Sequence, residues 1–200
     1  MAESLALTME SFSAVEPIRK NRFLVQFQTG GSGGLNEGGE GLSIACHSCT
    51  VPKLTITDKE LHRFNDRVYV PGKGEFDSVE FEFYEYINMK TGSTGEGTKS
   101  AGDILWGWLN KVYNPATGVA GYKSGIKNNA LIAQFDGAGN VVRTWNLYYA
   151  WPTTVEFDNL DSTSDDVQNV KVSLRYDWAA LNETGITYTP TTTGTGGDET

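Results

Sequence analysis

Two cysteines separated by two residues are the first group in this sequence that could carry out chemistry. Cys46 and Cys49 enclose His47, a spacing found in zinc sites and in redox-active dithiols. Tetrahedral zinc needs four ligands, and His62 is the only other histidine. A redox pair normally begins a helix after a strand, whereas Pro52 and extended segments follow here. Packing of both thiols in the interior is therefore favoured, and we expect no bound metal and no cofactor.

Pairs of carboxylates are the second candidate for chemistry. Glu80 and Glu82 lie two residues apart in an alternating segment, and Asp165 and Asp166 are neighbours in a polar one. Glycosidases use two carboxylates, but acids at these spacings usually belong to solvated faces. The chain also has only two histidines and no Gly-x-Ser-x-Gly motif for an activated nucleophile. The sequence therefore predicts no enzyme.

Glycine clusters are the third candidate, because glycine-rich loops can cradle phosphates. Residues 29–41 contain seven glycines, but no Lys-Ser/Thr pair of a P-loop follows them. A hairpin excursion is the favoured interpretation. Residues 90–98 form a second glycine-rich loop.

Aromatic side chains raise one further possibility. Trp145, Tyr148 and Trp151 could form a platform for sugar rings, which makes a carbohydrate-binding β-sandwich the alternative from another functional class. Because aromatic and apolar residues alternate through this segment, core packing is the better explanation.

Charge and composition exclude several classes of protein. Asp and Glu outnumber Lys and Arg by 25 to 16 in the 200 residues, so the net charge is −9. Proteins that grip a phosphate backbone cluster basic residues, so such binding is not expected. No run approaches the ~20 apolar residues of a membrane span, and residues 1–20 do not resemble a signal peptide. Aromatic residues make up 12% of the chain, which argues against disorder. We expect synthesis inside the cell.

Most elements that position these residues are predicted to be strands. Val79, Phe81 and Phe83 alternate with polar residues, as in a strand with one buried face. One helix is predicted over about 100–113, with Ser100 as its N-cap and an apolar stripe at helical spacing. The predicted strands are 21–28, 42–57 with a break at Pro52, 67–70, 77–89, 130–135, 141–151, 154–157 and 167–178, with turns at 71–74 and 136–140.

This pattern indicates an all-β protein with one α-helix, built as a sandwich or barrel-like domain. The domain is expected to cover residues 18–181. Residues 1–17 would form an N-terminal arm, in which 4–13 has the spacing of a short amphipathic helix. Residues 182–200 would form a flexible C-terminal tail.

The ordered segments of this domain resemble the tail tube protein of contractile-tailed (myovirus-type) bacteriophages. The resemblance covers roughly residues 18–178 and is carried by Lys20–Phe27, Ile44–Pro52, Asp66–Gly72, Phe76–Phe81, the helix around Trp106–Trp108, Tyr149–Thr153 and Val170–Trp178.

The resemblance implies a structural virion protein of the phage tail, made in the host cytoplasm and without catalytic activity. Six subunits would form a ring, the rings would stack, and strands from all six would close one β-barrel around a lumen. DNA would pass through this lumen without sequence-specific binding. The implied partners are the tail sheath, baseplate and tail-terminator proteins. A baseplate-proximal tube protein, or the tube of a related contractile injection or secretion system, remains an alternative.

Four residues are our candidates for the lumen surface. Glu80 and Glu82 lie opposite the apolar face of their strand, and Lys171 and Arg175 lie opposite the apolar face of theirs. An acidic or neutral lining would not hold a polyanion. The loops at 29–41 and 90–98 are additions to the family pattern and could contact the next ring, the sheath or only solvent. Cys46 and Cys49 could form disulfides between subunits if particles become oxidised after lysis.

Overall fold

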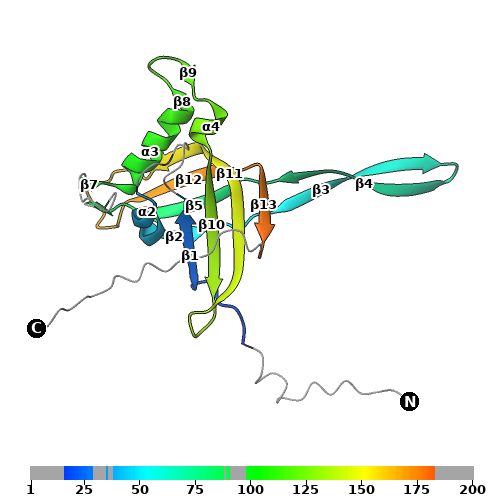
Figure 1. Cartoon of the computed structure of the whole chain (residues 1–200), viewed down its shortest axis with the longest axis horizontal. Coiled ribbons are helices and arrows are strands. Elements are labelled where there is room, and N and C mark those ends of the chain that lie inside the picture. The colour runs from blue at the N-terminus through cyan, green and yellow to red at the C-terminus, as the bar shows by residue number, and fades with distance from the viewer. Residues whose placement is uncertain (1–15, 29–34, 36–37, 88, 91–97, 183–200) are drawn as a thin grey trace, which may run out of the picture.

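Two antiparallel sheets that share one long strand make up the body of the protein (Figure 1). A computed structural model describes residues 16–28, 35, 38–87, 89, 90 and 98–182. Sheet A has the order β1 (Phe23–Phe27), β10 (Asn128–Phe135), the first half of β11 (Val141–Phe157) and β13 (Trp178–Leu181). Sheet B consists, in order, of the second half of β11, then β12 (Asn169–Arg175), β5 (Val79–Tyr84) and β2 (Cys46–Cys49). The predicted all-β class with one principal helix is confirmed. Within the described residues, neither sheet closes into a barrel.

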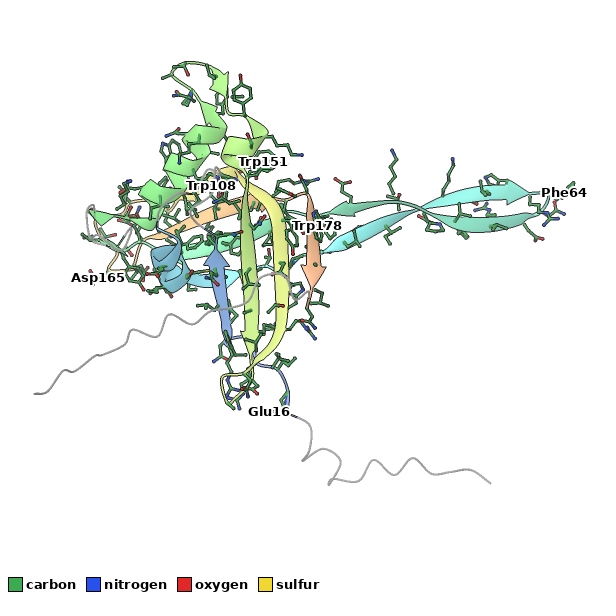
Figure 2. All side chains as sticks on the ribbon, in the orientation of Figure 1. Glu16, Phe64, Trp108, Trp151, Asp165 and Trp178 are labelled. Carbon is green, nitrogen blue, oxygen red and sulfur yellow. The ribbon has the colours of Figure 1, made fainter. Side chains whose placement is uncertain are left out.

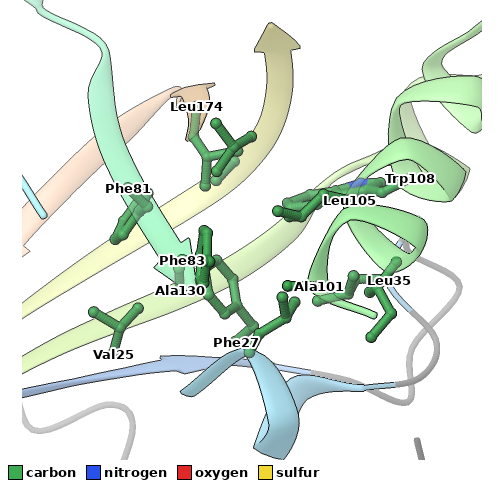
Figure 3. Close-up of a cluster of buried hydrophobic side chains, with 14 of the residues drawn as sticks. Val25, Phe27, Leu35, Phe81, Phe83, Ala101, Leu105, Trp108, Ala130 and Leu174 are labelled. Atoms are coloured by element: carbon green, nitrogen blue, oxygen red, sulfur yellow. The ribbon is translucent and has the colours of Figure 1, made fainter. Parts of the chain in front are cut away.

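The core lies between the facing sides of the two sheets (Figure 3). Val25 and Phe27 of β1 face Phe81 and Phe83 of β5, and all four side chains are buried as the alternation predicts. The rings of Phe27 and Phe81 meet edge to face with centroids 5.6 Å apart, a favoured aromatic geometry.

One helix closes an open side of this sandwich. Helix α3 (Ala101–Val112) buries Leu105 and Trp108 against the sheets (Figure 3). It begins with the predicted N-cap, because the Ser100 hydroxyl accepts from the Asp103 amide and the Asp103 carboxylate accepts from the Ser100 amide. The short elements β8 (Tyr113–Asn114), β9 (Val119–Ala120) and α4 (Lys123–Ile126) follow it.

Strand β11 differs from its predicted form because it bends from sheet A into sheet B. We expected Trp145, Leu147, Tyr149 and Trp151 on one face and an end at Pro152. Instead, Tyr149 has a left-handed φ of 59° and is exposed, so that Leu147 and Ala150 are both buried. The Asn129 side chain accepts the Tyr149 amide at 3.1 Å, and β11 continues through Pro152 to Phe157.

A long hairpin projects from the sandwich at the end of sheet B (Figure 1). It consists of β3 (Leu54–Arg63) and β4 (Asp66–Phe76), and we call it the arm. The predicted turn at 71–74 is wrong, because β4 passes straight through it and the chain reverses at Phe64 and Asn65 instead. Phe64 is fully exposed at the tip of the arm (Figure 2).

Three other predictions need correction. Helix α2 (Gly39–Ala45) occupies the end of the predicted loop 29–41 and the start of the predicted extended segment. The last strand is interrupted after Arg175, and Trp178 therefore leaves the core face and stacks on Tyr148 with centroids 3.9 Å apart. Strand β5 is shorter than predicted, and β6 (Met89–Lys90) pairs with β7 (Thr98–Lys99) beyond it. The predictions for 4–13, for most of 29–41, for 91–97 and for 183–200 lie outside the described residues.

Candidate functional site

The side of sheet B that faces away from the core is lined by polar residues, and we call it the polar face. The four residues predicted from strand alternation all lie on it, since each alternates with a buried neighbour on β5 or β12. The structure adds residues from the second half of β11. The polar face comprises Glu80, Glu82, Thr154, Glu156, Lys171, Ser173 and Arg175. Whether it lines a lumen stays a prediction.

A row of alternating charge crosses the middle of this face. Lys171 is registered against Glu82 on one side and Glu156 on the other. Its Nζ lies 3.1 Å from Glu82 Oε1. The hydrogen bond to Glu82 raises the pKa of Lys171, with a smaller contribution from the charge of Glu156. The polar face carries three carboxylates and two cations, so its net charge is slightly negative. It can therefore repel a polyanion while its cations remain paired with carboxylates.

Each end of the polar face has an additional contact. Arg175 Nη2 lies 2.7 Å from the carboxylate of Glu75 at the base of the arm. His47 stacks on Tyr84 with centroids 4.0 Å apart and lies 3.6 Å from Glu82. Sequence reasoning missed Glu156, although its place in the alternating Thr154–Phe157 segment was a usable signal.

The two cysteines lie on the opposite side of β2, against the core. Cys46 is registered with Phe83 and Cys49 with Phe81, and both pack on the core cluster as free thiols. A bulge between Cys46 and Ser48 brings both thiols to the same side. Burial raises the pKa of Cys46 to about 12 and that of Cys49 to about 11. Such thiols are poor nucleophiles, because the thiolate is the reactive form.

We therefore predict slow alkylation of both cysteines in the folded chain. At pH 8 iodoacetamide should modify each of them at least roughly 100-fold more slowly than in urea, where a thiol pKa returns to about 8.5. Folding favours the protonated form of both thiols, so their contribution to the free energy of unfolding is fully present below the thiol pKa of the unfolded chain. This contribution is lost as the pH rises through about 11 to 12. Mass spectrometry of timed samples measures the rates, and equal rates in buffer and urea would contradict the prediction.

The described residues show no arrangement typical of the other functional classes. No group of three or more His, Cys, Asp or Glu among them could hold a metal ion. The proposed sugar platform is split, since Trp145 packs against the core while Tyr148 stacks on Trp178 on the other side of sheet A. None of the described helices has the length and hydrophobicity of a membrane span.

A family model identifies the chain. The model described as T4-like virus tail tube protein gp19 matches residues 75–179, which run from the base of the arm to the start of β13. The chain belongs to this tail tube family. It is a subunit of a contractile tail tube, and the role of this family is structural. The resemblance seen in the sequence is therefore confirmed. No curated protein sequence matches the chain.

Solved structures show the same fold at low sequence identity. The tail tube chain is similar to a protein in the PVC sheath–tube complex of an extracellular contractile injection system in its extended state, with a TM-score of 0.60 and 18% identity over 87% of this chain and 97% of the other. It is also similar to a protein of the anti-feeding prophage tube-terminating cap, with a TM-score of 0.63 and 17% identity over 88% and 98%. A protein of the anti-feeding prophage baseplate gives a TM-score of 0.59 and 16% identity over 86% and 99%.

Proposed function

We propose that this tail tube subunit forms hexameric rings that stack into the conduit for DNA ejection from a phage particle. The polar face of sheet B would line the lumen, including Glu80, Glu82, Lys171 and Arg175. The sheath, baseplate and tail-terminator proteins are the proposed partners, in keeping with the complexes in which the proteins of similar fold occur. The subunit would be made in the host cytoplasm, without enzymatic activity, and then assembled into the virion tail.

One observation carries the DNA conduit proposal. The polar face combines three carboxylates with two cations and two hydroxyls, and its central Lys171 is already paired with Glu82 at 3.1 Å. Free cations would bind successive phosphates and slow the passage of DNA. Because Lys171 and Arg175 are both neutralised by neighbouring acids, the face offers DNA a hydrated surface with little attraction.

The arm is the proposed contact between copies of the subunit. All ten residues of β3 are exposed, and two-stranded hairpins on their own are marginally stable in water. The arm also exposes large apolar side chains, with Leu61 directly opposite Val68 and Phe64 at the tip. Strands of this length extend about 30 Å, so the arm can reach a neighbouring subunit and bury these side chains there.

The domain limits follow the same proposal. Residues 18–181 would form the tube domain, 1–17 an N-terminal arm and 182–200 a C-terminal tail. Cys46 and Cys49 would stay reduced in the particle, since both pack against the core.

Negative-stain microscopy of the purified full-length chain tests this function. We expect six-fold rings and tubes of constant width, together with a concentration-dependent rise in light scattering. A chain that remains monomeric at high concentration and is retained by glycan arrays would instead favour the carbohydrate-binding alternative.

A further inference from the structure

The side of sheet A that faces away from the core is buried, unlike the corresponding side of sheet B. Leu131 and Ala133 of β10 alternate with the core residues Ala130 and Ile132, so they point away from the core. Their exposed fractions are nevertheless only 2% and 1%. On β12 an outward residue such as Lys171 is exposed. Something outside the core cluster must therefore cover the outward side of sheet A.

None of the described helices supplies this cover. Helices α2 and α3 contact sheet A, but their buried apolar side chains belong to the core cluster. The row that includes Leu131 also contains Gln26 on β1 and Asn146 on β11. Asn146 has no exposed surface, and Gln26 Oε1 is buried without a hydrogen-bond donor among the described residues. Because a buried acceptor requires a donor, the cover must contain both apolar and hydrogen-bonding groups.

The C-terminal part of the chain starts at this surface. Asn182, which follows β13, donates its amide to Thr144 and accepts the Thr144 amide with its side chain. Thr144 is in turn registered with Ala133, so Asn182 lies in a row of the buried surface. Its φ of 53° turns the chain out of the path of the strand. Residues 183–200 therefore begin beside the side chains that need a cover.

We propose that residues 183–188 cross the outward side of sheet A in the same subunit, and we call them the strap. From β13 to β1 the crossing spans three strand spacings of about 4.8 Å each. About five extended residues at ~3.3 Å each cover this distance, so the strap is long enough. Its alternate residues Thr184, Ile186 and Tyr188 would point to the sheet.

The strap contains both kinds of group that this surface requires. Ile186 would pack on Leu131 and Ala133, and apolar contact of this kind accounts for their burial. Tyr188 would follow over β1, where its hydroxyl can donate to Gln26 Oε1. A tyrosine suits this position, because its ring can be buried while its hydroxyl keeps a partner.

The N-terminal segment 1–15 is the competing occupant, because it also contains large apolar residues. It joins the described chain at Glu16, which lies beside Gly137 at the end of sheet A (Figure 2). Asn182 is bound within the buried surface itself, and this favours the strap. The other residues outside the described chain, 29–34, 36–37, 88 and 91–97, are Gly, Ser, Thr, Asn and Glu only, so they supply no apolar cover.

The strap would form part of the outer surface of the tube. The core lies between the two sheets, so the outward side of sheet A and the polar face of sheet B lie on opposite sides of the sandwich. With the polar face at the lumen, the sheath would meet Glu183 and Thr187 of the strap instead of Leu131 and Ala133. Only this placement rests on the proposed function, since the contact itself lies within one subunit.

Thiol labelling beneath the strap tests the contact. Ala133→Cys in the otherwise native full-length chain places a thiol on the covered surface, while Cys46 and Cys49 report whether the sandwich stays folded. Iodoacetamide should modify all three thiols slowly. A stop codon after Asn182 should speed modification at position 133 at least tenfold and leave Cys46 and Cys49 slow. Mass spectrometry of timed samples measures each site separately.

Point variants separate the strap from its competitor. Ile186→Asp should speed modification at position 133 as the stop does, because a carboxylate is not buried in an apolar contact. Thr187→Asp, on the other side of the strap, is the matched control and should leave it slow, as should removal of residues 1–15. Fast modification in the full chain, continued protection in Ile186→Asp, or exposure only after loss of 1–15 would overturn the strap.

A crosslink provides a second measurement that needs no truncation. Ala133→Cys with Ile186→Cys should form a disulfide within one chain under mild oxidation, detected in peptides digested without reduction. Ala133→Cys with Thr187→Cys should give at least tenfold less. Equal yields, or a disulfide that joins two chains, would contradict a contact within one subunit. A chain that shows the crosslink but forms no rings would overturn the tube function and leave the strap intact.

Discussion

Removal of residues 57–73, the outer part of the β3–β4 arm, is expected to leave a folded subunit that no longer forms long tubes. The variant replaces residues 57–73 with Asn-Gly, a dipeptide that favours a tight hairpin turn between Ile56 and Gly74. Burial of a large apolar side chain contributes about 1.5–3 kcal/mol. Loss of Leu61, Phe64 and Val68 should therefore weaken contacts between copies at least roughly a thousandfold, at about 1.4 kcal/mol per tenfold.

Two measurements separate assembly from folding in this variant. Circular dichroism and urea unfolding should show an intact sandwich, because none of the removed residues 57–73 has a side chain in the core. Microscopy and sedimentation should show loss of tubes. Leu160→Ser is the matched control, since Leu160 is exposed but lies outside the arm. Tubes of normal length from the shortened chain would show that the arm is not the contact.

Reversal of Glu80 and Glu82 to Lys is expected to slow DNA ejection while tubes still assemble. The change removes two carboxylates from the polar face and places new ammonium groups beside Lys171. Because a phage tube repeats the subunit many times, DNA would meet unpaired cations along its whole path and bind them through its phosphates. Ejection should become slower by at least tenfold at low salt and recover as salt rises.

The controls for this prediction separate charge from geometry. Glu80→Gln with Glu82→Gln removes the carboxylates without adding cations and should eject DNA at close to the normal rate. Asp165→Lys with Asp166→Lys makes the same charge reversal on an exposed loop away from the polar face, and should also eject normally. Fluorescence of DNA released from particles measures the rate. If reversal at 80 and 82 left the rate unchanged, these residues would not face the lumen.

Local signals made part of this fold predictable from the sequence. Strand β5 was predicted because Val79, Phe81 and Phe83 alternate with polar residues, and α3 because Ser100 is an N-cap residue followed by an apolar stripe at helical spacing. The Asp136 turn was equally clear, since this carboxylate accepts from the amides of Ala138 and Asn140. In each case the residues that determine the structure are close together in the chain.

The remaining elements depend on contacts that are distant in sequence or absent from a single subunit. Of the arm, only the pieces within 42–57 and 67–70 were predicted as strands, because both of its faces are exposed and Pro71-Gly72 imitates a turn. The bend in β11 depends on Asn129, twenty residues before Tyr149. Alternation identified four residues of the polar face. Glu156 lies in a segment that also alternates, but its place beside Lys171 follows only from the pairing of β11 with β12.

The shared strand β11 has a mechanical consequence. Under axial load, a sandwich whose sheets are joined only by flexible loops can deform by sliding of one sheet over the other, opposed mainly by side-chain packing. Here the two sheets are joined by an uninterrupted backbone that crosses at Tyr149–Thr153. Relative sliding would have to extend this covalent link and break the Asn129 contact to Tyr149. The subunit should therefore behave as a stiff unit under force, and deformation of a tube should concentrate at the contacts between subunits.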